Sequence, residues 1–221
     1  MYIAFFKRFI DILLAVIGIP LLTIILVIVA PIIYFEDKSS IFYRALRLGK
    51  DGKVFLMYKF RSMKVNAPDI RNADGSTYNG SNDIRVTKIG KFLRKTSLDE
   101  APQLYNVLKG DMSVIGPRPD LPEHFEDYSN IEKRKLEIKP GITGFSQAYY
   151  RNTIPWKERI QHDIYYIDNM SFWLDIKIFL KTVVSVFSRK GIYVQQPEMA
   201  RIRKLEQEKE NIFDLEEKND Q

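Results

Sequence analysis

The chain has 221 residues, enough for one domain with a substantial core. Its composition, 45% hydrophobic and 28% charged, excludes a largely disordered protein. There is no cysteine, and His124 and His162 are the two histidines, which excludes disulfide frameworks, cysteine nucleophiles and multi-histidine metal sites. Any bound metal would therefore need carboxylate ligands, which favours magnesium or manganese.

The charge is unevenly distributed along the chain. Basic residues outnumber acidic ones, 34 to 28, for a formal net charge of +6. The segment 200–221 holds five basic and seven acidic side chains, so the preceding part of the chain carries a net charge of +8. A basic body is typical of proteins with an anionic partner such as nucleic acid, acidic lipid or a phosphorylated small molecule.

Residues 12–35 form an apolar stretch without a single charged side chain. As a helix it would be about 36 Å long, enough to cross the hydrocarbon core of a bilayer. Few helices of soluble proteins are apolar on every face. No small-residue cleavage site follows, as a signal peptide would require. The stretch therefore predicts a membrane-embedded helix.

Two features of this stretch bear on its topology. Pro20 lies near its middle, where proline removes a backbone hydrogen bond and kinks or breaks a helix. Both flanks are basic, with Lys7 and Arg8 before the stretch and several cations between positions 38 and 53 after it, so both ends favour the cytoplasmic side. A helix broken at Pro20 that re-enters the same leaflet satisfies both ends, with Thr23 as a partner for the freed backbone. A single span is the alternative.

The first half of the remaining chain predicts a hairpin, a loop and two helical segments. Residues 40–63 alternate around the turn 49–52, which indicates a β-hairpin. Residues 66–82 are rich in Asn, Asp, Gly and Ser and indicate a surface loop. Residues 88–108 have a helical pattern that is interrupted at Thr96-Ser97.

The second half contains two proline and glycine clusters followed by helices. Residues 116–119 predict a rigid extended segment and residues 140–144 a turn. Pro155 opens a helix that reaches about residue 169, and Ser171 is expected to cap a second helix over residues 172–189. That second helix has one broad apolar face, which would pack on the core or lie on a membrane surface.

Together these elements predict an α+β fold that is mostly helical and has amphipathic interfacial helices. The expected organisation is a membrane-embedded helix over residues 1–36, a catalytic domain over 37–190 and a charged tail over 191–221.

Asp99 and Glu100 are the carboxylates with the strongest catalytic pattern. Residues Ser97 to Glu100 match a helix capping box, in which Ser97 and Glu100 would satisfy backbone amides. Pro102 would then lie too deep in the helix, and starting the helix at Asp99 places this proline in the first turn. Either start puts two adjacent carboxylates at a helix N-terminus. Adjacent side chains do not share a helix face, so the two need different roles.

Several cations surround this carboxylate pair in sequence. Arg118 lies between two prolines and would lose little entropy on binding a phosphate. Lys59 and Arg61 alternate at the end of the predicted hairpin and would face one way. The helix before Asp99 supplies Lys88, Lys91, Arg94 and Lys95. Each alone is a common surface charge, but together they indicate a site for a phosphorylated substrate.

Six motifs then occur in one order along the chain, and this series resembles the bacterial sugar transferase family, the monotopic phosphoglycosyl transferases. The motifs are Lys7-Arg8-Phe9-Ile10-Asp11, Tyr58-Lys59-Phe60-Arg61-Ser62-Met63, Ser97 to Leu104, Asn106 to Ser113, Gly116-Pro117-Arg118-Pro119 and Lys139 to Gly144. The resemblance extends over residues 5–190. In place of the Ser-Pro pair that such proteins often have at the helix break, this chain has Ile19-Pro20.

The resemblance implies transfer of a sugar-1-phosphate from a UDP-sugar to polyprenol (undecaprenyl) phosphate, with release of UMP. It implies Asp99 as the nucleophile that forms a covalent phosphosugar intermediate, Glu100 as its partner, and Lys59, Arg94 and Arg118 at phosphate-contacting positions. It also implies a Mg²⁺ cofactor against Asp99 and a place in the bacterial inner membrane with the catalytic domain on the cytoplasmic face. The reaction would be the first membrane step of capsule, exopolysaccharide or glycoprotein glycan synthesis.

A membrane-anchored adaptor that binds anionic lipid or nucleic acid is the alternative function. The sequence has no interleaved basic and aromatic platform of the kind that single-strand binders use, so we expect no nucleic-acid partner. The expected partners are the UDP-sugar, polyprenol phosphate and membrane lipids. The sequence is compatible with a homodimer but does not require one.

Overall fold

A computed structural model describes residues 2–71, 78–80 and 82–188, and the predicted tail over 191–221 lies outside them. The α-helices are α1 (Lys7–Asp37), α2 (Lys88–Thr96), α3 (Gln103–Lys109), α4 (Phe145–Tyr149), α5 (Trp156–Asp168) and α6 (Phe172–Ser188), and the strands are β1 (Phe42–Leu48), β2 (Val54–Phe60), β3 (Ser113–Ile115) and β4 (Gly141–Thr143). In the described part of the chain β1 pairs with β2 antiparallel and β3 pairs with β4 parallel. The predicted α+β, mostly helical fold is confirmed.

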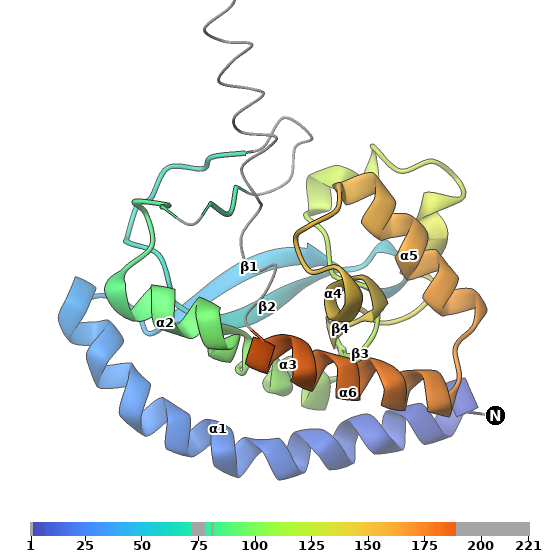
Figure 1. Cartoon of the computed structure of the whole chain (residues 1–221), viewed down its shortest axis with the longest axis horizontal. Coiled ribbons are helices and arrows are strands. Elements are labelled where there is room, and N and C mark those ends of the chain that lie inside the picture. The colour runs from blue at the N-terminus through green and yellow to red at the C-terminus, as the bar shows by residue number, and fades with distance from the viewer. Residues whose placement is uncertain (1, 72–77, 81, 189–221) are drawn as a thin grey trace, which may run out of the picture.

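The N-terminal apolar stretch forms the single long helix α1, which is continuous through Pro20 and Pro31. Figure 1 shows α1 as a curved rod that arcs beneath α2, α3 and α6. The helix is therefore curved, and it is not interrupted at Pro20, where we predicted a break. The Thr23 hydroxyl donates to the carbonyl of Ile19 at 3.0 Å. Thr23 thus has a local partner, but that carbonyl is not the one that Pro20 leaves without an amide, four residues before the proline.

The middle of α1 is apolar and open to its surroundings. Its most apolar 18-residue window has a mean hydropathy of 3.2, and 11% of that window is buried. Helices in the core of soluble proteins bury their apolar residues, whereas Val27 is 70% exposed here. An exposed apolar surface of this length fits a membrane anchor.

The N-terminal end of α1 is tied to the rest of the protein by charged side chains. Lys7 forms a buried ion pair with Asp175 of α6 at 2.6 Å. Arg8 donates to two backbone carbonyls in the last turn of α3. The Asp11 carboxylate accepts hydrogen bonds from the Ser113 hydroxyl at 2.9 Å and from the following backbone amide at 2.8 Å. The first sequence motif therefore fastens α1 to β3, α3 and α6.

The C-terminal end of α1 is tied to the same body. The Glu36 carboxylate accepts hydrogen bonds from the backbone amides of Lys88 and Ile89, at 2.6 and 3.1 Å, in the first turn of α2. These amides have no partner within their own helix, so Glu36 supplies the acceptor. Asp37 accepts from the backbone amide of Val65 at 2.7 Å. Both ends of α1 thus contact one globular unit, and its exposed apolar middle lies between them (Figure 1).

The two short sheets hold the segments that carry the candidate site. The predicted hairpin is confirmed, and its turn contains Asp51 and Gly52 in left-handed conformations. Residues 140–144, predicted as a turn, instead supply β4. There Gly116 and Gly141 approach so closely that a side chain on Gly141 would collide with the Gly116 backbone. So short a strand within a Pro and Gly cluster gives no alternating pattern, which explains the wrong prediction.

Helix α6 has an apolar face that the rest of the described protein does not cover. Its buried residues are Asp175 and Ile178. The exposed residues of the face are Phe172, Trp173, Phe179, Leu180, Val183, Val184 and Phe187. Of the two sequence interpretations, the exposed aromatic residues favour an interfacial helix over a core-facing one.

Candidate active site

The two candidate carboxylates lie on a short 3₁₀ turn, Leu98–Glu100, between α2 and α3. Ser97 ends α2 in a left-handed conformation with φ of 57°, and its side chain makes no capping hydrogen bond. The predicted capping box is therefore wrong: the chain reverses at Ser97, and α3 begins only at Gln103, directly after Pro102. This reversal presents Asp99 and Glu100 between two helices rather than inside one.

Glu100 is held by cations from two other segments. Its Oε1 atom lies 2.7 Å from Nζ of Lys59 and 3.9 Å from a guanidinium nitrogen of Arg118. Burial alone would raise the pKa of Glu100, but Lys59 and Arg118 hold it below its usual value. Glu100 is therefore an anion fixed in place by its partners.

Asp99 has a different environment from its neighbour. It is half-buried, and its carboxylate makes no hydrogen bond or ion pair with any residue that the structure describes. Burial raises the pKa of Asp99; the positive charge of Lys59 opposes this rise, and the negative charge of Glu100 adds to it. The surrounding positive charges do not outweigh the effect of burial on this pKa. The result is an unpartnered carboxyl group in a positive field.

The three predicted phosphate-binding cations come from separate segments and meet around Asp99. Lys59 lies near the end of β2, Arg94 in the last turn of α2, and Arg118 after β3. The positive charge of each acts on the Asp99 carboxyl group. The structure thus brings together all five predicted site residues, although they are spread from the hairpin to the proline-rich segment in sequence.

Backbone hydrogen bonds fix the segment that carries Arg118. The backbone amide of Gly116 donates to the carbonyl of Thr143, and the amide of Gly141 donates to the carbonyl of Pro117, each at 2.9 Å. The carbonyl of Asp120 accepts from the amide of Leu48 in β1, also at 2.9 Å. The extended segment is thus anchored on both sides of Arg118, whose side chain is 37% exposed and accessible to a ligand.

A model of the family described as bacterial sugar transferase matches residues 2–189. The chain belongs to the bacterial sugar transferase family. The matched range includes α1, both sheets and all five candidate site residues.

Curated relatives of this sugar transferase agree with that family. The chain is 44% identical over 193 residues to "Galactosyl transferase CpsE" of Streptococcus agalactiae, covering 84% of this chain and 43% of the relative. It is 42% identical over 196 residues to "UDP-glucose:undecaprenyl-phosphate glucose-1-phosphate transferase" of Klebsiella pneumoniae, covering 85% and 41%. It is 39% identical over 186 residues to "Uncharacterized sugar transferase EpsL" of Bacillus subtilis, covering 84% and 89%. The chain thus spans less than half of the first two relatives and most of the third.

Some predicted cations of this sugar transferase do not join the site. Lys88, Lys91 and Lys95 are exposed on α2. Arg61 donates to the Ser39 hydroxyl at 2.9 Å, so its guanidinium does not lie with the Lys59 ammonium in the candidate site. Conversely, the charge of Arg151 reaches Glu100 and helps to lower its pKa. Its position after an aromatic segment, far from Glu100 in sequence, gave no signal for this proximity.

Of the two carboxylates at the candidate site, that of Asp99 is the one that fits a magnesium ion. The described residues contain no group of three or more acidic or histidine side chains that could hold a metal alone. Magnesium in phosphoryl-transfer sites is commonly bound by one or two carboxylates together with water and substrate phosphates. The unpartnered Asp99 carboxylate suits that role, whereas Glu100 is already bonded to Lys59.

Proposed function

We propose that this sugar transferase moves a sugar-1-phosphate from a UDP-sugar to polyprenol phosphate through a covalent phosphosugar intermediate on Asp99. The observation that carries the proposal is the Asp99 carboxyl group, which has no described partner and lies in the field of Lys59, Arg94 and Arg118. A nucleophile for a dianionic diphosphate must be accessible and surrounded by positive charge. The name of the Klebsiella relative supplies the donor and acceptor class.

The first step forms the intermediate. An oxygen of ionised Asp99 attacks the β-phosphorus of the donor, the one bonded to the sugar, and the bond between this phosphorus and the oxygen bridging to the α-phosphorus breaks. UMP leaves with that bridging oxygen and its electron pair. Lys59, Arg94 and Arg118 would neutralise negative charge on the phosphoryl oxygens. Because the pKa of Asp99 is raised, this step requires a pH at which the carboxyl group is ionised.

The second step releases the product and restores the enzyme. A phosphate oxygen of polyprenol phosphate attacks the same phosphorus, and the bond to Asp99 breaks. Glu100, fixed by Lys59, would hold this cation beside the reacting phosphate in both steps. Mg²⁺ bound by Asp99 and phosphate oxygens would supply further charge neutralisation.

The membrane arrangement supports an acceptor in the lipid phase. We propose that α1 re-enters one leaflet of the bacterial inner membrane, with residues 37–190 as the catalytic domain on the cytoplasmic face. The attachment of both α1 ends to one body supports re-entry, because a spanning helix would carry its ends to opposite faces. The exposed apolar face of α6 would lie at the same surface.

Intact-mass analysis with the donor alone tests the covalent step. The wild-type protein should gain the mass of one sugar-phosphate and release one equivalent of UMP, and Asp99→Asn should do neither. Asp69→Asn, which changes an exposed carboxylate, is the matched control and should behave as wild type. UMP release that requires the acceptor, with no adduct, would instead mean direct transfer between donor and lipid. No turnover of any UDP-sugar, with salt-dependent binding to anionic lipid, would favour the adaptor function.

Labelling of single cysteines tests the topology. Cysteines introduced at positions 5 and 64 of this cysteine-free chain should react with an impermeant reagent from the same side of sealed vesicles. Reaction from opposite sides would mean that α1 spans the membrane.

A further inference from the structure

A buried ion pair lies beside the candidate site, directly after the polar loop predicted over residues 66–82. Arg85 and Asp83 have side chains that are 3% and 2% exposed. Two guanidinium nitrogens of Arg85 meet the two carboxylate oxygens of Asp83, Nε to Oδ1 at 2.9 Å and Nη2 to Oδ2 at 2.7 Å. Burial alone would raise the pKa of Asp83, but these hydrogen bonds hold it below its usual value, so the pair is ionic.

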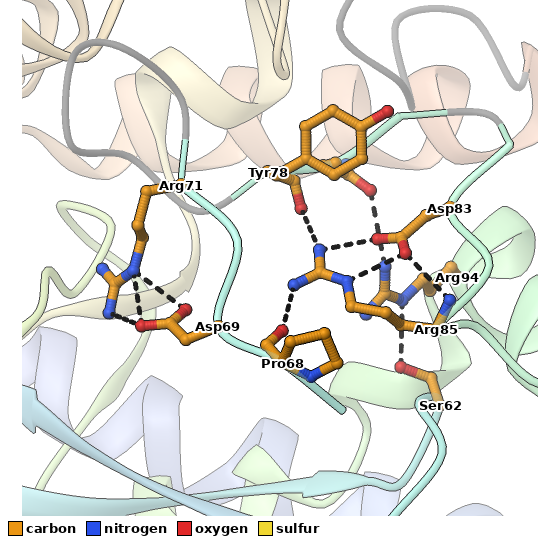
Figure 2. A network of polar contacts seen from close by, with 9 residues as sticks. Ser62, Pro68, Asp69, Arg71, Tyr78, Asp83, Arg85 and Arg94 are labelled. Atoms are coloured by element: carbon orange, nitrogen blue, oxygen red, sulfur yellow. Dashed lines mark hydrogen bonds and ion pairs between the residues drawn. The ribbon is translucent and has the colours of Figure 1, made fainter. Parts of the chain in front are cut away.

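The other side-chain hydrogen bonds of Arg85 reach two distant points of that loop. Its Nη1 donates to the carbonyl of Pro68 at 2.8 Å, and Nη2 donates to the carbonyl of Tyr78 at 3.2 Å. Figure 2 shows the guanidinium between these two carbonyls and the Asp83 carboxylate. We call Asp83 and Arg85 the clasp. It fixes the positions of residues 68 and 78 relative to the chain that enters α2.

The clasp is connected to Arg94, a candidate phosphate-binding residue. Asn79, the residue after Tyr78, accepts a long hydrogen bond of 3.5 Å from Nη1 of Arg94. Nε of Arg94 donates to the buried Ser62 hydroxyl at 2.9 Å. Figure 2 shows the hydrogen bond between Arg94 and Ser62. The orientation of the Arg94 guanidinium thus depends on where the clasp holds residues 78 and 79.

A buried ion pair of this kind is a poor source of net stability. Removing two charges from water costs about as much free energy as their attraction returns, so buried pairs are often better explained by the geometry that they impose. The planar fork of arginine can bond a carboxylate and two carbonyls at fixed angles, which lysine cannot reproduce.

We propose that Asp83 and Arg85 are positioning residues that orient Arg94 toward the phosphates of the donor. The proposal rests on the proposed function in one respect, the binding of donor phosphate by Arg94. Misplacement of a binding group by about 1 Å is enough to slow a reaction substantially. The clasp would therefore act on catalysis without contacting substrate.

A double-mutant cycle on the 221-residue chain in lipid nanodiscs tests the coupling. UMP release from the UDP-sugar gives kcat/KM for Arg85→Lys, Asn79→Ala and Arg94→Lys, singly and with Arg94→Lys combined with each of the others. We expect Arg85→Lys to lower kcat/KM about tenfold in the wild-type background. In the Arg94→Lys background the same change should have less than about a twofold effect, because lysine lacks the Nε group and the fork that Ser62 and Asn79 hold. Equal effects in both backgrounds would overturn the proposal.

Two controls separate positioning from a general loss of structure. Arg71→Lys changes the neighbouring Arg71–Asp69 pair, which lies in the same loop but has Glu123 as its further partner rather than the Arg94 network. It should leave kcat/KM within about twofold of wild type. Asn79→Ala, which keeps the clasp intact, should reproduce part of the Arg85→Lys effect and should also lose it in the Arg94→Lys background. If the wild-type protein releases no UMP, the proposed function fails; if it does and the cycle is additive, only the clasp proposal fails.

Discussion

Two clusters of carboxylates and cations differ in how completely their charges are paired. In the candidate site, Glu100 is bonded to Lys59, while Asp99 has no partner among the described residues. In the second cluster, the buried Lys135 lies between the carboxylates of Asp120 and Asp163, with the Asp163 oxygen at 3.2 Å. Similar residue types thus form one centre with an unpaired carboxylate and another in which two carboxylates share a central cation.

The second cluster also has neutral hydrogen-bond donors that complete it. Tyr128 donates to Asp120 at 2.6 Å, and Ser146 donates to Asp163 at 2.8 Å. Asp120 directly follows the segment that carries Arg118, so the cluster fixes one end of that segment. Pairing of the charges thus produces a rigid support, whereas the absence of pairing at Asp99 leaves a group available for reaction.

The largest expected effect comes from removing the unpaired carboxylate. Asp99→Asn should lower UMP release at least about a thousandfold, because the amide cannot serve as the nucleophile. Glu100→Gln should lower it less, about ten- to a hundredfold, since it weakens the hold on Lys59 but leaves the nucleophile. A quench-flow assay of UMP release with both variants measures the difference. Equal losses would mean that the two carboxylates act as one unit and do not have different roles.

The second cluster should respond in stability rather than in chemistry. Lys135→Met leaves two buried carboxylates without their cation and should lower the free energy of unfolding by about 3–5 kcal/mol. Denaturant unfolding in detergent, followed by tryptophan fluorescence, measures this change, since Trp156 lies near the cluster. Lys133→Met is the matched control because Lys133 lies outside the cluster and is exposed, and it should change the free energy by less than about 0.5 kcal/mol. A similar small change for both variants would contradict the supporting role.

Sequence alone could predict the long apolar helix and the hairpin, and it named five candidate site residues that the structure brings together, because each rests on local pattern or on an ordered motif. It could not predict the conformation at the site. Ser97 has the residue type of an N-cap, but the chain uses it in a left-handed conformation to end α2, a choice that depends on packing between two helices. Neither could pattern show that Arg61 turns to Ser39 while Lys59 turns to Glu100.

The sequence likewise could not predict the clasp or the second cluster, because both depend on packing between distant segments. Asp83 and Arg85 directly follow the stretch 66–82, whose composition indicates an exposed loop, and no pattern in the sequence indicates that their side chains are almost completely buried. Lys135 lies in a run of charged residues that is typical of a solvated surface. Burial of a charge depends on partners that are distant in sequence, here Asp120 and Asp163 for Lys135, and no local pattern encodes such pairs.

An intermediate effect is expected where the two regions meet, at Arg118. Arg118→Lys keeps the positive charge but loses the fork that can bind a phosphate with two hydrogen bonds, so kcat/KM for the donor should fall about tenfold. The control is Lys53→Arg, the opposite exchange at an exposed position of the hairpin turn. It should leave kcat/KM unchanged. Steady-state kinetics with varied UDP-sugar measure both. An unchanged Arg118→Lys would show that Arg118 contributes charge alone.

The smallest effect concerns the pH dependence of the second cluster. Burial acts to lower the pKa of Lys135, but Asp120 and Asp163 raise it above its usual value. A raised pKa in the folded state means that the contribution of Lys135 to stability is fully present below its unfolded pKa of about 10.4 and is lost as the pH rises through the folded value. The difference in unfolding free energy between wild type and Lys135→Met should therefore be constant between about pH 7 and 9 and shrink only above about pH 10.4. Denaturant titrations of both proteins across this range measure it. A difference that already shrinks below about pH 9 would mean that the carboxylates do not hold the proton on Lys135, and that the two clusters are less different than their geometry indicates.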